Sequence, residues 1–324
     1  MTKKTKPSIK LGFSDGISIV FAVFLFVVFL KNSSIAANEV SHALKMCARV
    51  LIPSLFPLMT VSEIMTESHA SDKITSIFSV PISKLFNVSK NATSPYFLGL
   101  FGGYSSACKS AVLMYQNGKI SKVDLESIIA ISNIPSLAFM TGFIGIGIFK
   151  NPTIGWVLWI VAVLSTLILG IINRIFFKSS VQIYKNDISI SKSPKKFSKI
   201  IIDAIGHSSQ AMLTICSCVI FFSVLISILK LYLINIPISE NAKNLLLGML
   251  ELTQGISSCA YFKNFFHRAL ACAFLVGWSG LCVHFQVIAL CEDEEISFKK
   301  YFIFKGLQGV ICLALAWLFF CFKF

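Results

Sequence analysis

Residues 99–110 read GLFGGYSSACKS, and this stretch decides how the chain is expected to fold. Two glycines, two serines and Lys109 interrupt a strongly apolar run, which continues as AVLMY. Non-helical backbone is costly in lipid, because each N–H or C=O group without a partner costs several kcal/mol there. The stretch therefore predicts the tip of a re-entrant hairpin over residues 94–115, whose broken backbone lines a cavity.

The composition of the whole chain indicates an integral membrane protein. Its 324 residues are 55% hydrophobic and only 14% charged, whereas soluble domains are about 25% charged. The net charge of +14 does not indicate nucleic-acid binding, because the basic residues lie mostly in short segments between apolar runs. The ten cysteines include no Cys-x-x-Cys pair, so no metal site is expected. We therefore expect membrane lipid to surround the apolar segments of the chain.

A second stretch repeats the pattern of the first. LFGGYSSAC (residues 100–108) and LTQGISSCA (residues 252–260) both place a glycine three residues after leucine, and a Ser-Ser pair two residues after that glycine. Each follows a span and precedes a span that contains polar residues. The order predicts a second hairpin over residues 243–262 and two structural repeats.

The apolar runs and the basic segments predict the topology. The expected crossings are residues 17–30, 49–66, 125–148, 153–177, 213–235, 267–290 and 300–322. The basic N-terminus and the lysine-rich segment 178–199 are expected inside, so the first hairpin enters from inside and the second from outside. The expected fold class is an all-α polytopic membrane protein with about seven crossings and two opposed re-entrant helical hairpins in two inverted-topology repeats. The C-terminus is expected outside.

The same pattern divides the chain into four parts. These are an N-terminal transmembrane segment (1–36), a first repeat (37–177), a basic cytoplasmic linker (178–199) and a second repeat (200–324). The first segment also fits a cleavable signal peptide, but a retained crossing is favoured because more spans follow.

The candidate solute site lies where the hairpin tips meet the breaks in the crossings that follow them. Glycine permits the tight turn, and serine hydroxyls bind solute or cap freed backbone. The candidate residues are Gly103, Tyr104, Ser105, Ser106 and Lys109 in the first hairpin, Asn133 and Ser136 in the first break, Glu251, Thr253, Gln254, Ser257 and Ser258 in the second hairpin, and Ser279, His284 and Gln286 at the second break.

Several of these residues also have a purely structural interpretation. A charge at the bilayer centre costs at least about 2.5–3.5 kcal/mol, so Lys109 faces an aqueous cavity or Glu251, or it reaches back to the cytoplasm. Glu251 pairs with Lys109, binds a coupling cation or proton, or caps a helix. His284 is either functional or a satisfied structural group. Lys305 and Gln308 lie one turn apart on one helix face and fit a bridge between helices.

The sequence favours transport over catalysis. It contains no Gly-x-Ser-x-Gly elbow, no His-Glu-x-x-His motif and no P-loop, so an enzyme is not expected and no cofactor is expected. A secondary transporter or permease for a small polar solute is the first hypothesis, with a proton or sodium as coupling ion. A non-transporting membrane protein that assembles or matures an envelope complex is the alternative.

Five short stretches resemble a known family. In order, GGYSSACK, GKIS, GMLELTQG, GWSGLCVHFQ and KGLQG are similar to the YlbJ-like sporulation integral membrane proteins of endospore-forming Firmicutes, in the nucleoside-recognition (Gate) domain group. The resemblance covers about residues 37–310. The family usually has proline and glycine in the first tip, where this chain has Ser105 and Ala107, and an Asn-Asn-x-Gly-Pro-like break, where it has SNIPS (132–136).

The resemblance implies a fold related to concentrative nucleoside transporters and a role in sporulation. One family member is assigned to moving dipicolinate across the outer forespore membrane. The implied solute is therefore small and polar or anionic, such as dipicolinate or a nucleoside-like compound. The implied location is the bacterial cytoplasmic membrane or the outer forespore membrane, and assembly as a homo-oligomer stays open.

Overall fold

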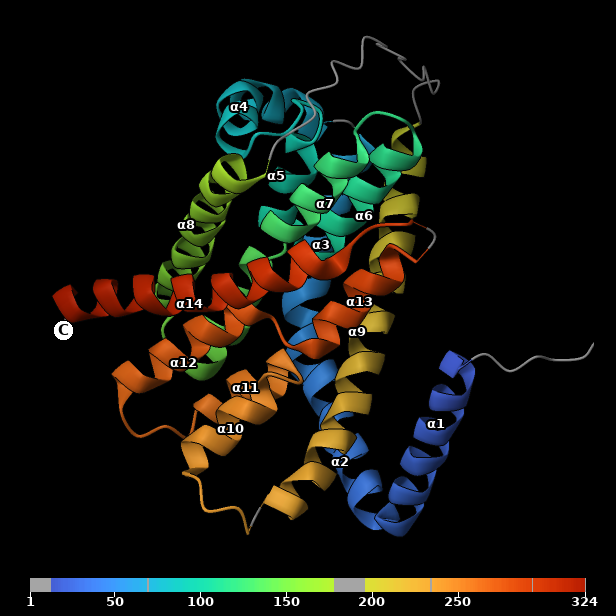
Figure 1. Cartoon of the computed structure of the whole chain (residues 1–324), viewed down its shortest axis with the longest axis vertical. Helices are drawn as coiled ribbons and strands as arrows, with labels where there is room; N and C mark the ends of the chain where they lie inside the picture. The colour runs from blue at the N-terminus through green and yellow to red at the C-terminus, as the bar shows by residue number, and fades with distance from the viewer. Residues whose placement is uncertain (1–12, 69, 178–195, 234, 293, 324) are drawn as a thin grey trace, which may run out of the picture.

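The computed structural model describes residues 13–68, 70–177, 196–233, 235–292 and 294–323, and all regular elements in these ranges are helical (Figure 1). Two of them, η1 and η2, are π-helical. In chain order the elements are α1 (Phe13–Lys31), α2 (Ser33–Met46), η1 (Cys47–Leu51), α3 (Ile52–Glu67), α4 (Ala70–Phe86), α5 (Thr93–Gly102), α6 (Tyr104–Gln116), α7 (Lys122–Ile131), η2 (Phe139–Ile148), α8 (Pro152–Phe176), α9 (Phe197–Leu233), α10 (Glu240–Gly248), α11 (Leu252–Cys259), α12 (Phe265–Trp278), α13 (Leu281–Leu290) and α14 (Phe298–Lys323).

Within these ranges, four segments are long and apolar enough to cross a membrane. They are α8, α9, the region of α12 and α13, and most of α14. A fifth candidate combines α1 with α2 and η1, which are bent by 93° relative to each other. The chain is thus an all-helical integral membrane protein, and the count of seven crossings stays a prediction. Most of the expected cytoplasmic linker, residues 178–195, lies outside the described residues.

Two of the expected crossings differ in the structure, for identifiable reasons. The 49–66 run belongs to helical residues 33–67, where the π-helical turn η1 ends two residues before Pro53 and where Pro57 lies inside α3. Proline and π-helical turns both interrupt the regular ladder. The 125–148 run is split into α7 and η2, of 10 residues each, which is half of what a straight span needs.

The structure has a closely packed helix pair at the position of each predicted hairpin, and the re-entry of these pairs into the membrane stays a prediction. In the first, α5 and α6 approach so closely that a Cβ at Gly99 would lie 2.7 Å from the Cβ of Ala107. In the second, α10 and α11 bring Gly248 against Gly255, where an added Cβ would lie 2.4–2.7 Å from the Cα opposite. Small residues on both sides of each tip therefore allow the two arms to pack.

Each hairpin tip contacts the break in the helix pair that follows it. Gly103 has φ +82°, and a Cβ there would lie 2.9 Å from the backbone nitrogen of Ser136, between α7 and η2. Gly280 also has φ +82°, and a Cβ there would lie 2.9 Å from the backbone nitrogen of Leu252, at the second tip. The same tip-against-break contact thus occurs in both halves of the chain.

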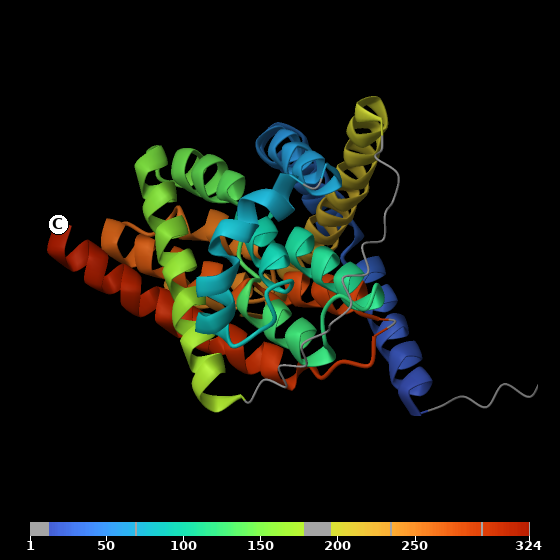
Figure 2. The ribbon, with the colours of Figure 1, turned by 90° about the horizontal axis from the view of Figure 1, so that it is seen from above.

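The long helices surround these contacts. α3 and the 37-residue α9 pack along one another, and α12 packs most extensively against α14. α1 has few contacts and stands at the edge of the molecule in both views (Figures 1 and 2). Its apolar side chains, from Ile17 to Leu30, are largely exposed, as lipid-facing residues are.

The α12–α14 contact yields a first prediction. Gly277→Ala lowers thermal stability, because a Cβ there would lie 2.6 Å from the backbone oxygen of Gln308. Overpacking of this kind costs about 1–3 kcal/mol. Gly306→Ala is the matched control, since its Cβ would meet nothing within 4 Å, and alanine is about 1 kcal/mol better than glycine in a helix.

Thermal unfolding of the purified variants in detergent measures the difference. Gly277→Ala should unfold below the wild type, and Gly306→Ala at the wild-type temperature or above it. Equal unfolding temperatures for the two variants would contradict the close approach of α12 and α14.

Candidate functional site

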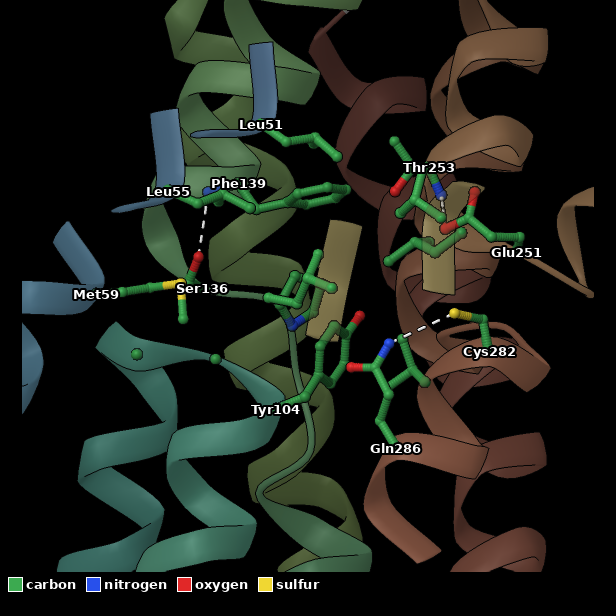
Figure 3. Close-up of a pocket in the computed structure, with 17 residues that line it drawn as sticks. Leu51, Leu55, Met59, Tyr104, Ser136, Phe139, Glu251, Thr253, Cys282 and Gln286 are labelled. Carbon is green, nitrogen blue, oxygen red and sulfur yellow. Dashed lines mark hydrogen bonds between the residues drawn. The ribbon is translucent and has the colours of Figure 1, made fainter. Parts of the chain in front are cut away.

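A cavity of about 70 Å³, the central cavity, lies where both hairpin tips, the first helix break and the start of α13 meet. η1, α3 and α9 close it with apolar side chains, among them Leu55, Met59 and Val219. Figure 3 shows Ser136 and Phe139, from the first broken helix, across the cavity from Glu251 and Thr253 at the second tip. The structure thus brings together segments that are more than a hundred residues apart in the sequence.

The first tip and the first break supply one side of the central cavity. Gly103, Tyr104 and Ser136 all line it, as the sequence predicts for a site at this tip. The Ser136 hydroxyl accepts a hydrogen bond of 3.2 Å from the backbone nitrogen of Phe139. This bond satisfies one N–H at the start of the helical stretch that includes η2, so Ser136 both lines the cavity and stabilises the break.

The second tip is held by Glu251. This residue is buried, and its two carboxylate oxygens accept hydrogen bonds from the backbone nitrogens of Thr253 and Gln254, at 2.9 and 2.6 Å. Glu251 therefore caps the N-terminus of α11, where a negative charge is stabilised by the helix dipole. Of the roles expected for Glu251, the structure therefore shows the helix cap. Glu251 and Thr253 also line the central cavity.

A second, larger cavity of about 360 Å³, the side cavity, adjoins the first. The two share three lining residues, Met59, Ile215 and Gln286. The side cavity carries more polar groups, contributed by α3, α6, α9 and α13: Glu63, Ser106, Lys109, His207, Gln210, Thr214 and Gln286. Lys109 and Glu251 therefore line different cavities, and the predicted contact between them is not present.

The other predicted site residues lie outside both cavities. Gln254 donates to the Ser223 hydroxyl at 2.8 Å, and the Ser279 hydroxyl donates to the carbonyl of Val276 at 3.3 Å. Asn133 and His284 are buried in a separate polar cluster. Ser257 and Ser258 are half-buried on α11, and the side chain of Ser105 lies outside the described residues. Solute binding by these residues stays a prediction.

The separate polar cluster joins α14 to both breaks. Lys305 is fully buried, and its Nζ donates to the carbonyl of Asn133 and to Oε1 of Gln308, both at 2.7 Å. Gln308 donates in turn to the Ser165 hydroxyl in α8. The Tyr301 hydroxyl accepts from Nδ2 of Asn133 at 2.8 Å and contacts Nδ1 of His284 at 2.7 Å. Lys305 and Gln308 thus bridge helices.

Comparison with known proteins finds one relative of nearly full length. The chain is 23% identical to the sporulation integral membrane protein YlbJ of Bacillus subtilis (strain 168) over 321 aligned residues, which cover 90% of this chain and 79% of the relative. The expected likeness to the YlbJ-like family is confirmed. No protein-family model matches the chain, and no solved structure matches it.

The site includes residues that the motifs did not indicate. Glu63 lies in the side cavity, as do three polar residues on one face of α9, His207, Gln210 and Thr214. Their spacing of three and four residues repeats the helical period, so a polar stripe on an otherwise apolar helix was the available signal. The apolar residues of α3 and α9 that line the central cavity carry no such signal, because a core position has the same composition.

The cap at the second tip yields a second prediction. Glu251→Ala lowers thermal stability, because it removes the acceptors of two N–H groups at a buried helix end, which costs about 1–3 kcal/mol. Glu251→Gln loses less, since its amide oxygen still accepts. Glu240→Ala is the control, because Glu240 is exposed and pairs with Lys243 in the same helix, and such pairs contribute little.

The measurement is thermal unfolding of the three variants in one detergent. The expected order of unfolding temperatures is Glu251→Ala lowest, Glu251→Gln intermediate and Glu240→Ala near the wild type. If Glu251→Ala unfolded together with Glu240→Ala, the carboxylate would not hold the tip.

Proposed function

We propose that the chain is a permease that moves a small polar or anionic solute through the central and side cavities. The observation that carries the proposal is the convergence of both hairpin tips, the first helix break and the start of α13 on one cavity. Interrupted backbone inside a bilayer is tolerated where it lines a cavity, and secondary transporters bind solutes at such places. The relative's description as a sporulation protein supports a role in sporulation for this chain as well.

The helix ends at the cavity suit a polar or anionic group. α6 begins at Tyr104, α11 at Leu252 and α13 at Leu281, and all three starts lie at or beside the central cavity. Helix N-termini carry a partial positive charge. Glu251 already offsets that of α11, and the first N–H groups of α13 bond to the carbonyls of Met249 and Leu250, which leaves that of α6 toward the cavity. In the side cavity, the positive charge of Lys109 would attract an anion that enters.

The cavity volumes suggest which step this conformation represents. The central cavity, at about 70 Å³, holds no more than a few water molecules. The side cavity, at about 360 Å³, falls within the usual range for small-molecule sites. We infer that solute enters through the side cavity and that the tips must separate to admit it further, as alternating access requires.

We further propose that the two halves are inverted repeats with hairpins entering from opposite sides of the membrane. The recurrence of hairpin, broken helix and long helix in the same order supports this. In this topology the N-terminus lies inside and the C-terminus outside. The tight closure of the central cavity is the observation that favours the alternative, a non-transporting protein whose tips serve only as a rigid core for an envelope complex.

Transport by reconstituted protein separates the two functions. Proteoliposomes should take up radiolabelled dipicolinate or uridine, and uptake should be lost in Lys109→Ala and Gln286→Ala, because these changes remove polar groups from the proposed path. Ser106→Ala should reduce uptake for the same reason. Lys122→Ala is the matched control, since Lys122 is an exposed lysine at the start of α7.

Two outcomes would contradict the proposal. Wild-type uptake in Lys109→Ala and Gln286→Ala would exclude the cavities as the path. Absence of uptake of either probe by folded wild-type protein would favour the non-transporting alternative.

A further inference from the structure

Lys305 is a buried amine without a carboxylate partner among the described residues. It is 0% exposed in the middle of α14, and it takes part in none of the ion pairs found there. Its Nζ has two hydrogen-bond acceptors, the carbonyl oxygen of Asn133 and Oε1 of Gln308. A neutral amine has two N–H donors, whereas an ammonium group has three. These two acceptors are enough for the neutral form, and protonation would add a third N–H.

The groups around Lys305 do not supply a compensating negative charge. Tyr104 of α6 presents its ring 5.9 Å from Nζ. The other titratable groups that face it are His284 of α13 and Cys312 of α14. A buried ammonium here would be stabilised only by neutral dipoles and by one aromatic ring, which is far less than a carboxylate provides.

The remaining ionisable groups on the elements packed against α14 are engaged elsewhere or exposed. Asp124 and Glu126 of α7 accept from the backbone nitrogens of Ser89 and Ser297. Arg174 of α8 and Arg268 of α12 donate to backbone carbonyls. Lys122 and His267 are exposed.

The cluster around Lys305 also contains polar atoms with no partner in the described structure. These are Oδ1 of Asn133 and Nε2 of His284, both buried. Buried polar atoms without hydrogen bonds are uncommon and costly. They show that this cluster is incompletely satisfied in the present conformation, as a site that gains and loses a proton and rearranges would be.

We propose that Lys305 is the proton-binding residue of the transport cycle, so that the proton is the coupling ion. In this scheme the amine takes one proton from water on one side of the membrane, becoming an ammonium group, and returns the same proton to water on the other side. This inference rests on the proposed permease function, because it names the ion coupled to that solute movement.

Two contacts link the protonation of Lys305 to the solute path. The carbonyl that accepts from Nζ belongs to Asn133, three residues before Ser136, which lines the central cavity. Protonation strengthens this bond, because hydrogen bonds from charged donors are about twice as strong as neutral ones. The third N–H of the ammonium group then faces Tyr104, whose side chain also lines the central cavity. Protonation of Lys305 thus changes its contacts with both the first break and the first tip.

A pH-jump experiment tests proton binding without any solute. Wild-type protein reconstituted on a solid-supported membrane should give a transient charge displacement when the external pH is changed. The displacement should be lost in Lys305→Met and retained in Lys300→Met. Lys300 is the matched control, because it is a second buried lysine in α14 that donates to the Ser127 hydroxyl instead of to a helix break.

Solute measurements supply the second arm. With dipicolinate or uridine as probe, a pH gradient should drive accumulation in wild-type proteoliposomes, and uptake should be accompanied by proton movement reported by a trapped dye. Lys305→Met should keep exchange of the neutral probe uridine but lose its accumulation, a division that a merely structural residue would not produce. Solute accumulation that ignores the pH gradient would overturn the inference while leaving the permease function intact.

The outcomes remain decisive if the substitution impairs folding. Lys305→Gln then replaces Lys305→Met, with monodisperse elution as the criterion of folding. Absence of a pH-jump displacement in the wild type overturns the inference by itself. A displacement that depends on Lys305 in a protein that moves neither probe supports proton binding and counts against the two solutes alone.

Discussion

The structure depends on satisfying backbone groups where helices break inside an apolar bundle. At the second tip, the carbonyl of Met249 accepts from the Leu281 backbone nitrogen at 2.9 Å and from Nε1 of Trp278 at 3.0 Å. At the first break, the carbonyl of Asn133 accepts from Lys305. Each unpaired group would cost several kcal/mol in this environment. The second tip is therefore fixed to the following broken helix and the first break to α14, and these attachments hold the walls of the cavity in place.

The same requirement explains why so many polar side chains at this site have two tasks. Ser136 caps a helical segment and lines the cavity, and Glu251 does both at the opposite tip. A side chain engaged in capping is held in position, which suits a site that must recognise a small molecule. Opening the second tip would break the bonds from Leu281 and Trp278 to the Met249 carbonyl, so the closed conformation is the one favoured when nothing else compensates.

The sequence predicted the helical class, both hairpins and both breaks, because clusters of glycine, proline and polar residues inside apolar runs indicate interrupted helices in a membrane protein. Gly103 and Gly280 adopt the unusual backbone conformations that such positions need. The sequence could not predict that Lys109 faces a different cavity from Glu251, because register and rotation of a helix depend on packing partners. His284 and Asn133 illustrate the same limit, since a buried polar network and a solute site use the same residue types.

The protonation of Lys305 also bears on how a proton and an anion would bind together. In its neutral form the amine donates to the Asn133 carbonyl and to Gln308, and it carries no charge that could offset a bound anion. Protonation places a positive charge beside Tyr104 at the central cavity, and this charge favours the anion in a medium of low dielectric constant. By linkage, the bound anion favours the proton to the same extent, and a carrier with this core would move the two in the same direction.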